Sequence, residues 1–513
     1  MAYYLETSIA IFSIFLINQA FKQWSHRRRA NEAAKSHGCK PATRYPYWEP
    51  FLGLDVFLFL GVKTINGERS DEFVKIHAKY GPTFAMKCLS KEPMLQTSSP
   101  KNIQTIAATK FDDWGVGPIR GNIGAPFLDR GVFTEDGDFW KHSRALIRPT
   151  FNRAEIADLD HFENYVARFL KLIPRDVTTF DFQELTKRLF LDTSSEFLFG
   201  QSINSLFPET PFDTHEFMEA FDYSLFGLAL RLVAGPLKPL FFFDPTWKKA
   251  YTKVHKFVDQ KVQIALERQR EISKTGKDPD EHGSKGKYVL LNQMALETQD
   301  AYDLRSQIVN IFFPARDTAA IAIGNVMFEL ARHPQYWDEL RAEVEGIGER
   351  KLTYELIKHL KVAKAIINET LRLHLPGTRI SRTSLRDTIL PEGGGPDQRS
   401  PLFVPKGTFI EMDLYALHRN PKIWGDDAEE FRPSRWKEGR DLWEAKWQYA
   451  PFLGGIRMCP GQPLVLTQVT YLLVRLAQEF SAVENRDSVY RYVEEIKMTV
   501  ESKNGVKISL TPA

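Results

Sequence analysis

Cysteine is scarce in this sequence, and its positive and negative charges nearly cancel. The 513 residues contain three cysteines, Cys39, Cys88 and Cys459, an odd number scattered along the chain. This pattern is typical of a reducing compartment rather than of a disulfide framework. Sixty-eight Lys and Arg against 65 Asp and Glu leave a formal net charge of +3, too little for a general nucleic-acid binder. We therefore expect no nucleic-acid partner.

Long apolar runs are also few, and the overall composition is that of a globular protein. Apolar residues make up 43% of the chain and charged residues 26%, which excludes a disordered, collagenous or multi-span membrane protein. The length fits about three average domains or one large enzyme core equally well.

One apolar stretch stands out at the amino terminus, from Tyr3 to Phe21. It has about the length that a helix needs to cross a bilayer, and Lys22 and three arginines follow it at 27–29, as in a stop-transfer sequence. The basic flank places the rest of the chain in the cytoplasm. A helix that lies on the membrane surface is the alternative. The expected organisation is an anchor (1–25), a basic, proline-containing linker (26–50) and one large domain (51–513).

The dominant period in the remaining chain is helical. Apolar residues run around most of the cylinder from about Asp303 to Arg332, which predicts a long buried helix. Strand signals are fewer, the clearest being Ser400 to Ile410, which contains a Pro and a Gly that mark a turn. The polar stretch from Arg270 to Lys287 reads as a surface loop. The predicted class is mostly α, in an α+β arrangement with a small sheet.

The strongest chemical signal surrounds Cys459, in the sequence FLGGIRMCPG. Glycines before and after the cysteine, including Gly455 and Gly461, let backbone amides approach its sulfur without a Cβ in the way. An apolar helix follows, and its N-terminus favours a negative thiolate. Arg457 can meet an anionic group on a cofactor, and Phe452 can pack over the sulfur side. A single cysteine in such a loop suits an axial ligand of haem iron.

This ten-residue pattern resembles, at every defining position, the haem-binding loop of cytochrome P450 monooxygenases, and further motifs follow in that family's order from about residue 40 onward. The resemblance implies the cytochrome P450 fold, a helix-rich domain with a small β-rich subdomain. It implies haem b between the helices called I and L, with the Cys459 thiolate as iron ligand. Electrons are expected from a separate NADPH-cytochrome P450 reductase, because no flavin- or nicotinamide-binding region is evident.

Two other motifs resemble structural parts of the family. Glu369 and Arg372 match its Glu-x-x-Arg on helix K, and three residues apart they share a helical face. Such a pair is common and usually solvated when it stands alone. Here the segment FRPSRW supplies Arg435 as the third member of the family's buried Glu-Arg-Arg network.

The resemblance also assigns residues to the haem propionates. Trp140 and Arg144 match the Trp-x-x-x-Arg pattern of helix C, and spacing of four places both on one face. Taken alone, they would be a packing residue and a solvated arginine. Arg382, after helix K, and Arg457 in the cysteine loop resemble further propionate partners.

The segment PARDTA within the long helix resembles the family's oxygen-activation motif. Asp317 and Thr318 match its acid and hydroxyl, which can hold water and deliver the protons that dioxygen cleavage requires. The sequence departs from the motif at Pro314, Ala315 and Ala319. Pro314 removes a backbone donor, so a local kink could replace the widening that glycine normally allows.

Within the family, Gly131 to Arg153 and the stretch from Arg382 to Gly407 are similar to fungal alkane and fatty-acid hydroxylases. The Phe-rich segment from Phe221 to Phe243 falls where the family has its F and G helices and its access route, although plain core packing explains it equally well. Related sequences also tailor polyketides and other fungal metabolites, which the haem motifs cannot distinguish.

The expected function is hydroxylation of a lipophilic substrate by a haem-thiolate monooxygenase in contact with membrane lipid. The expected location is the endoplasmic reticulum membrane, with a single span and a cytoplasmic catalytic domain. A haem-binding regulator without turnover and an enzyme that rearranges an oxygenated substrate without reductase are the alternatives.

Overall fold

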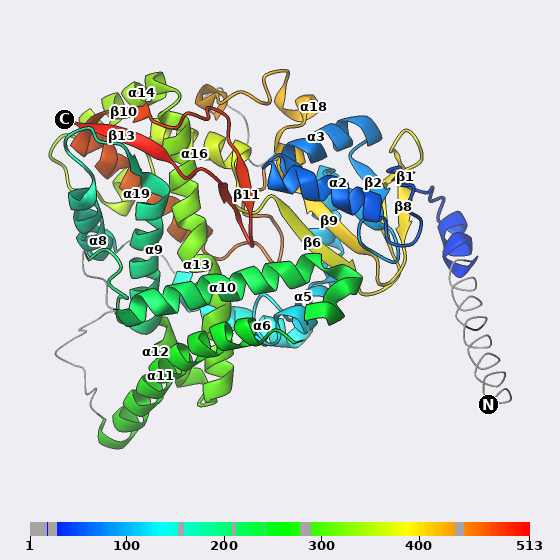
Figure 1. Ribbon diagram of the computed structural model, residues 1–513, viewed down its shortest axis with the longest axis horizontal. Helices are drawn as coiled ribbons and strands as arrows, with labels where there is room; N and C mark the ends of the chain where they lie inside the picture. Colours follow the sequence, from blue (N-terminus) through cyan, green and yellow to red (C-terminus); the bar gives the residue numbers. More distant parts are fainter. Residues whose placement is uncertain are drawn as a thin grey trace.

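The computed structural model describes residues 28–151, 158–207, 212–241, 243–276, 289–436 and 446–513, together with Asn18. A large helical part and a smaller β-rich part lie side by side in this described chain (Figure 1). The predicted mostly helical α+β class is confirmed.

The helices and strands have the following bounds. The α-helices are α2 (Leu54–Ile65), α3 (Arg69–Tyr80), α4 (Pro100–Gln104), α5 (Gly117–Gly124), α6 (Gly137–Ile147), α8 (Leu159–Leu172), α9 (Phe182–Phe199), α10 (Phe212–Val233), α11 (Pro245–Thr275), α12 (Leu290–Glu297), α13 (Ala301–Leu330), α14 (Pro334–Glu345), α15 (Tyr354–Ile357), α16 (Lys361–Leu373), α17 (Leu414–His418), α18 (Pro421–Trp424) and α19 (Gln462–Glu479). The other helical turns are η1 (Thr105–Thr109), η2 (Phe111–Asp113), η3 (Arg148–Phe151), η4 (Gly235–Phe241) and η5 (Pro433–Trp436). The strands are β1 (Thr43–Arg44), β2 (Thr83–Met86), β3 (Met94–Thr97), β4 (Trp114–Gly115), β5 (Phe180–Asp181), β6 (Arg379–Ser384), β7 (Thr388–Gly394), β8 (Ser400–Val404), β9 (Phe409–Asp413), β10 (Phe480–Asn485), β11 (Glu494–Ile496), β12 (Val500–Ser502) and β13 (Lys507–Pro512).

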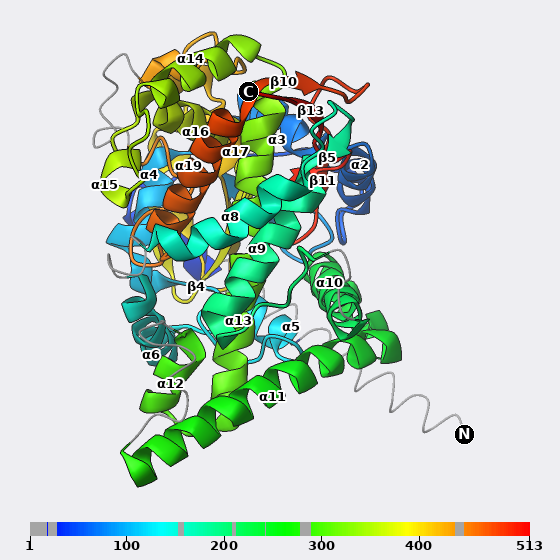
Figure 2. The same cartoon turned by 90° about the vertical axis from the view of Figure 1, so that its left-hand side faces the viewer.

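Helix α13 crosses the helical part, with α9, α11, α16 and α19 packed around it (Figures 1 and 2). It is the long buried helix predicted over 303–332. Its first turn is fixed by the Asp300 side chain, which accepts hydrogen bonds from the amides of Tyr302 and Asp303. The helix continues through Pro314 without interruption.

Two apolar clusters divide the length of α13 between them. The first half, including Ile308 and Phe312, packs in a cluster with α9, α10, α11 and α12, which we call the front cluster. The second half, including Ile323 and Met327, packs in a cluster with α8, α9, α14, α16 and α19. The change from one cluster to the other falls at residues 314–318, in the predicted oxygen-activation segment.

The β-rich part is built on a six-stranded sheet in the order β1-β2-β3-β9-β6-β4. Strands β1 and β2 and strands β3 and β9 pair in parallel, and the other neighbours are antiparallel. The predicted strand segment 400–410 contains β8 and the start of β9, with Gly407 in a turn at a φ of 85°. Helices α2 and α3 cover one face of this sheet through an apolar cluster that contains Phe73 and Phe84.

The predicted membrane helix in residues 1–25 lies outside the described residues, apart from Asn18. None of the helices in the described ranges is both long enough and apolar enough to cross a membrane. Part of the expected linker is built into the fold, because Thr43 and Arg44 form β1 and the amide of Lys40 donates to the carbonyl of Pro401 (3.0 Å).

The loop predicted from Arg270 starts later than expected. Helix α11 runs on to Thr275, where Gly276 ends it in the left-handed conformation, and residues 277–288 lie outside the described part. The stretch from Arg270 to Thr275 is polar but rich in straight-chain helix formers, so it continues an established helix at little cost.

Candidate functional site

Cys459 lies at the end of a short loop, immediately before α19. Its amide donates to the carbonyl of Phe452 (3.1 Å), which closes the loop. Burial raises the pKa of the Cys459 thiol, while the amides of Gly461 and Gln462 and the charge of Arg144 act in the opposite direction. The predicted apolar helix after the cysteine is α19, with Gly461 as its N-cap residue. Backbone donors and a helix N-terminus therefore converge on one sulfur atom.

The loop packs against η1, and this contact explains why a glycine is required at position 455. Gly455 has a φ of 76°, and a Cβ at this position would lie 2.0 Å from the carbonyl oxygen of Ala107. The next amide, of Ile456, donates to the same carbonyl (3.3 Å). On its other side the loop is held by Arg144 of α6, whose Nη2 donates to the carbonyl of Met458 (2.9 Å).

Three guanidinium groups, those of Arg120, Arg382 and Arg457, gather around the carboxylate of Asp136. Arg457 Nη2 donates to Asp136 Oδ1 (2.6 Å), and Asp136 also accepts from the amides of residues 116 and 117. Burial and the charges of Arg120 and Arg457 lower the pKa of Arg382 to about 9, and burial lowers the pKa of Arg457 to about 10. The cluster holds more positive than negative charge, which suits an anionic ligand.

Arg382 is an arginine of this cluster whose charge has no carboxylate within ion-pair distance among the described residues. It is only 4% exposed, and Nη1 donates to the carbonyl of the preceding residue, Ser381 (2.8 Å). No ion pair within 4 Å involves it among the residues that the structure describes. Trp140 lies beside the cluster, with the guanidinium carbon of Arg457 4.5 Å from its ring centroid.

The predicted acid and hydroxyl lie where the buried part of α13, after its first turns, has accessible surface. From residue 306 to residue 330, all side chains are buried except Pro314, Ala315, Asp317 and Thr318. The hydroxyl of Thr318 donates to the carbonyl of Pro314, one turn earlier (2.9 Å). These four residues therefore interrupt an otherwise buried stretch of the helix.

Arg316 connects this segment to α10. Its Nη2 donates to Asp222 Oδ1 (2.5 Å), and its Nε lies 2.9 Å from Asp317 Oδ1 without the alignment of a hydrogen bond. Burial raises the pKa of Asp317, and Arg316 opposes this shift. The Asp317 carboxyl thus has one buried oxygen, lies beside a cation and is protonated more readily than the carboxyl of an exposed aspartate.

Glu369, Arg372 and Arg435 form one buried network. Glu369 accepts two hydrogen bonds from Arg372 (both 2.9 Å) and one from Arg435 Nε (2.8 Å), and the indole of Trp436 donates to it as well (2.9 Å). Arg372 also donates to the carbonyls of residues 418, 428 and 430. The network ties α16 to the segment that precedes the cysteine loop.

Comparison with known proteins agrees with this geometry. Residues 49–506 match the family model of cytochrome P450. The chain is a cytochrome P450. Over its full length it is 37% identical to the cytochrome P450 monooxygenase himC of Aspergillus japonicus, covering 91% of that protein. It is also 37% identical to the cytochrome P450 monooxygenase fsdH of Fusarium heterosporum, with 92% of this chain and 83% of that protein covered. Cytochrome P450 52A3-B of Candida maltosa is 38% identical, with 83% of each protein covered.

The chain is therefore a cytochrome P450 monooxygenase, and the cofactor of this family is haem bound through a cysteine thiolate. The residues present fit that group. Cys459 would ligate the iron, and Arg382 and Arg457, with Trp140 and Arg144 nearby, would hold the propionates. When bound, haem supplies an iron centre whose thiolate ligand favours O–O cleavage. The unpaired charge of Arg382 and the accessible surface of α13 are the structural features that this assignment explains.

Sequence reasoning did not find three residues of this site. Arg120 and Asp136 come from separate segments, and an aspartate before a helix reads as an N-cap. Asp136 does precede α6, but its carboxylate binds Arg457 instead of capping the helix. Arg316 stands at the position of the motif that takes any residue, so only the fold shows its pairing with Asp222.

Proposed function

We propose that this cytochrome P450 hydroxylates an aliphatic carbon of a lipophilic substrate at the endoplasmic reticulum membrane, with electrons from a separate NADPH-cytochrome P450 reductase. The observation that carries the proposal is the position of Asp317 and Thr318. These two polar residues follow an aromatic turn of α13, Phe312 and Phe313, which belongs to the front cluster.

The acid and the hydroxyl serve proton delivery. Burial raises the pKa of the Asp317 carboxyl, so this group holds a proton more readily than an exposed aspartate and can pass it on. Thr318 holds its hydroxyl at the accessible surface of α13, with its proton directed to the carbonyl of Pro314. Its oxygen lone pairs remain able to accept a hydrogen bond from water. Ala319 offers no second hydroxyl, so Thr318 has no neighbour that could replace it.

The substrate side of this segment is apolar and aromatic. Phe312 packs against Phe221 of α10, with ring centroids 5.0 Å apart, and Phe313 packs against Phe133 at 5.7 Å. Phe133 is only partly buried, so this aromatic surface is not fully closed by protein. An aliphatic chain that packs on such surface gains about 25 cal/mol per Å² of apolar area removed from water.

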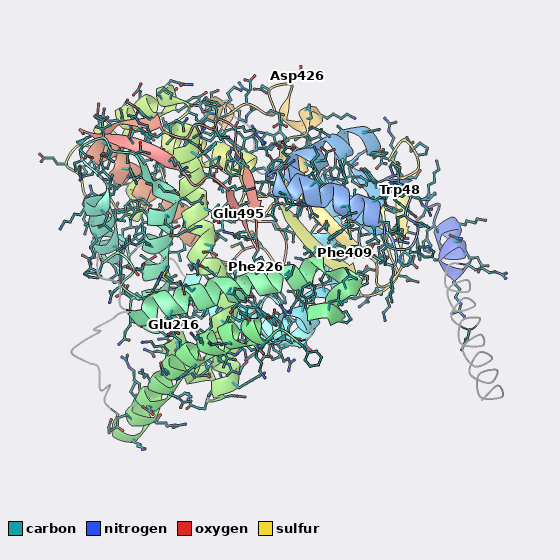
Figure 3. The ribbon with its side chains drawn as sticks, in the orientation of Figure 1. Trp48, Glu216, Phe226, Phe409, Asp426 and Glu495 are labelled. Carbon is teal, nitrogen blue, oxygen red and sulfur yellow. The ribbon has the colours of Figure 1, made fainter. Side chains whose placement is uncertain are left out.

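The exposed apolar surface supports membrane contact. Trp48, which precedes α2, and Phe226 of α10 are exposed and are labelled in Figure 3. Leu58 and Ile65 of α2 and Leu240 of η4 are exposed as well. The two groups are joined through residues 89 and 90. A Cβ on residue 235 would lie 2.5 Å from the carbonyl oxygen of residue 89. The amide of residue 90 donates to the carbonyl of residue 52 (3.0 Å). Exposed apolar residues gathered in this way are typical of a membrane contact.

Reductase docking is proposed on the face of the cysteine loop. Ile456 and Met458, on either side of Arg457, are exposed at 51% and 39%. Lys141 and Arg148, from α6 and η3, are exposed as well, and α6 contacts the loop through Arg144. An apolar centre with basic residues beside it suits an acidic partner surface.

Co-expression with a reductase and feeding of fatty acids, alkanes and polyketide precursors tests the proposal. We expect a product that carries one added oxygen atom from dioxygen and that forms only with NADPH and reductase. A product formed without them would indicate a rearrangement enzyme, and haem binding without NADPH consumption would indicate a regulator.

Membrane attachment is tested in the same cells. Deletion of residues 1–29 should release most of the protein from membranes and leave weak attachment through the exposed apolar surface. Release of the full-length protein by carbonate alone would contradict a spanning helix and favour one that lies on the surface.

A further inference from the structure

One guanidinium group, that of Arg316, stands between two carboxylates on different helices. Its Nη2 donates to Oδ1 of Asp222 on α10 (2.5 Å), and its Nε lies 2.9 Å from Oδ1 of Asp317 on α13. The first contact is an aligned hydrogen bond, whereas Asp317 Oδ1 is a buried oxygen with no hydrogen-bond donor among the described residues. Arg316 thus bonds to the distant acid and not to its neighbour in the chain.

The two acids differ in their exposure to water. The side chain of Asp222 is 55% exposed and that of Asp317 is 14% exposed. Water stabilises the charge of an exposed carboxylate, whereas a poorly solvated carboxylate is protonated more readily. Asp222 is therefore suited to be the constant partner of Arg316, and Asp317 to be the group that exchanges protons.

Further charges approach Asp317 from α9 and β12. Burial raises the pKa of Asp317, Arg316 lowers it and Asp222 raises it. Lys187 of α9 and Glu501 of β12 have smaller effects on this pKa, in opposite directions, and they pair with each other (2.9 Å). The position of Arg316 between its two carboxylates is therefore the contact that most affects the protonation of Asp317.

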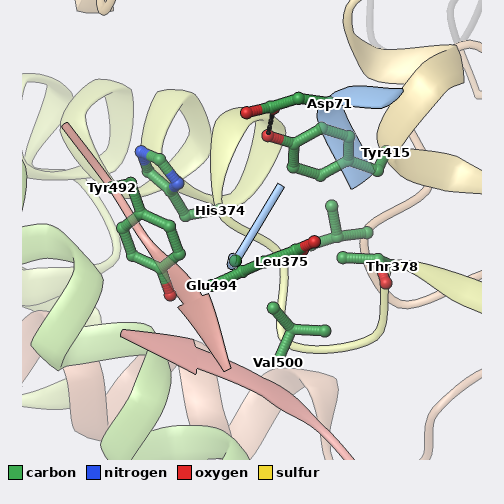
Figure 4. A pocket seen from close by; sticks show the side chains of 9 residues that line it. Asp71, His374, Leu375, Thr378, Tyr415, Tyr492, Glu494 and Val500 are labelled. Atoms are coloured by element: carbon green, nitrogen blue, oxygen red, sulfur yellow. Dashed lines mark hydrogen bonds between the residues drawn. The ribbon is translucent and has the colours of Figure 1, made fainter. Parts of the chain in front are cut away.

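The β11–β12 hairpin also borders a small cavity, which is not part of this group of charges. Glu494 lines the cavity, as does Asp71, whose carboxylate accepts from the hydroxyl of Tyr415 (2.7 Å) (Figure 4). The cavity has a volume of about 10 Å³, which is room for at most one water. Neither Asp317 nor any of the charged groups around it lines this cavity.

Asp222 belongs to the same turn of α10 that packs on the aromatic turn of α13. The preceding residue, Phe221, contacts Phe312 with ring centroids 5.0 Å apart. The guanidinium carbon of Arg316 lies 5.3 Å from the ring centroid of Phe221. The position of α10 over the aromatic surface therefore also determines whether Arg316 keeps its hydrogen bond to Asp222.

We propose that Asp222 and Arg316 are positioning residues for proton delivery: Asp222 holds the guanidinium away from Asp317, so that the Asp317 carboxyl can pass on a proton and take up another from water. This inference rests on the role of Asp317 in the function proposed above. When Asp222 is removed or α10 moves away, Arg316 is able to turn to Asp317, form an aligned ion pair and hold it as a carboxylate. Proton delivery is thereby coupled to the seating of α10 on the substrate side of α13.

Infrared titration of the haem-containing protein tests the charge of Asp317 without any substrate. The carbonyl band of the protonated carboxyl is assigned by its loss in Asp317→Asn, and its pH midpoint is compared between the parent, Asp222→Asn, Asp222→Glu and Arg316→Gln. The matched control is Glu216→Gln, which removes a partly exposed carboxylate of α10 that pairs with Lys253 of α11 (Figure 3). The carbon monoxide spectrum verifies that each variant is folded and loaded.

We expect Asp222→Asn to lower the midpoint by about one pH unit or more, because Asp317 gains the whole guanidinium and loses a neighbouring negative charge. Arg316→Gln should raise the midpoint, since it removes the cation. Asp222→Glu and Glu216→Gln should stay near the parent value. An unchanged midpoint in Asp222→Asn, or shifts in the same direction in Asp222→Asn and Arg316→Gln, would overturn the inference.

Turnover separates this inference from the proposed function. With reductase and whichever of dodecane, dodecanol and dodecanoic acid the parent oxidises fastest, the share of consumed NADPH that appears as product should fall as the pH rises. In each variant this fall should move in the same direction as the infrared midpoint. A product share that keeps its pH dependence while the midpoint shifts would overturn the positioning role, whereas a parent protein that oxidises no lipophilic compound would overturn the proposed function whatever the midpoints are.

Discussion

Replacing Glu369 with glutamine would preserve the shape of this side chain and remove the charge that holds α16 to the later part of the chain. Five donors surround the carboxylate. Oε1 accepts from Arg372 Nη2, Arg435 Nε and the amide of Arg432, while Oε2 accepts from Arg372 Nε and the indole of Trp436. Whichever way the glutamine amide turns, its NH₂ group meets at least two of these donors.

Removing one partner of a buried ion pair typically costs about 3–5 kcal/mol, a large share of the total stability of about 5–15 kcal/mol. We therefore expect Glu369→Gln to lose haem during purification and to unfold at a much lower urea concentration. The matched control is Glu345→Gln, which removes an exposed pair with Arg341 (3.2 Å) and should cost at most about 1 kcal/mol. If Glu369→Gln keeps its haem and its urea midpoint agrees with that of the control, the network does not support the fold as argued here.

Three further predictions concern the proton path, the response to acid and the reductase. Thr318→Ala should keep the carbon monoxide spectrum but lower the share of consumed NADPH that appears as product, by a factor of about 10² at most, with hydrogen peroxide formed instead. The control Thr467→Ala loses the same type of hydrogen bond to a proline carbonyl, in α19, and should keep product formation coupled to NADPH consumption. Equal coupling in both variants would refute the role of Thr318. His418 accepts a hydrogen bond from the amide of Ala450 (3.0 Å), and burial lowers the pKa of His418 to about 3, so protonation favours the unfolded chain. The free energy of unfolding should therefore fall by up to about 1.4 kcal/mol per pH unit as the pH drops from about 6.5 towards 3. In acid denaturation, His418→Gln should flatten this slope. A slope that the substitution leaves unchanged would mean that other groups control acid unfolding. The double variant Lys141→Glu, Arg148→Glu should raise the KM for reductase several-fold at low salt and less at high salt. The control Lys248→Glu on α11 should leave this KM unchanged. An unchanged KM in the double variant would show that reductase does not dock on the face of the cysteine loop.

Local patterns could be predicted from the sequence, whereas pairings between distant segments could not. The period of apolar residues placed α13 within two residues at each end, and Pro405 and Gly407 marked the turn before β9. The amino-acid pattern around Cys459 carries its own chemistry, because the glycines act on the neighbouring backbone.

The arginine clusters depend on the fold instead. Arg120 and Asp136 approach Arg457 only after α5, α6 and the cysteine loop have packed together, and nothing in their own segments indicates it. Polarity misled the prediction at Arg270, because a charged, exposed helix end and a loop have similar composition.

The assignment of Cys459 as the iron ligand is the central claim, and the carbon monoxide difference spectrum of the reduced protein tests it most directly. The parent protein should show the Soret band that gives the family its name, and Cys39→Ala and Cys88→Ala should keep it. Cys459→Ala should lose the band altogether. Retention of the band in Cys459→Ala, or its loss in Cys88→Ala with haem content unchanged, would contradict the account.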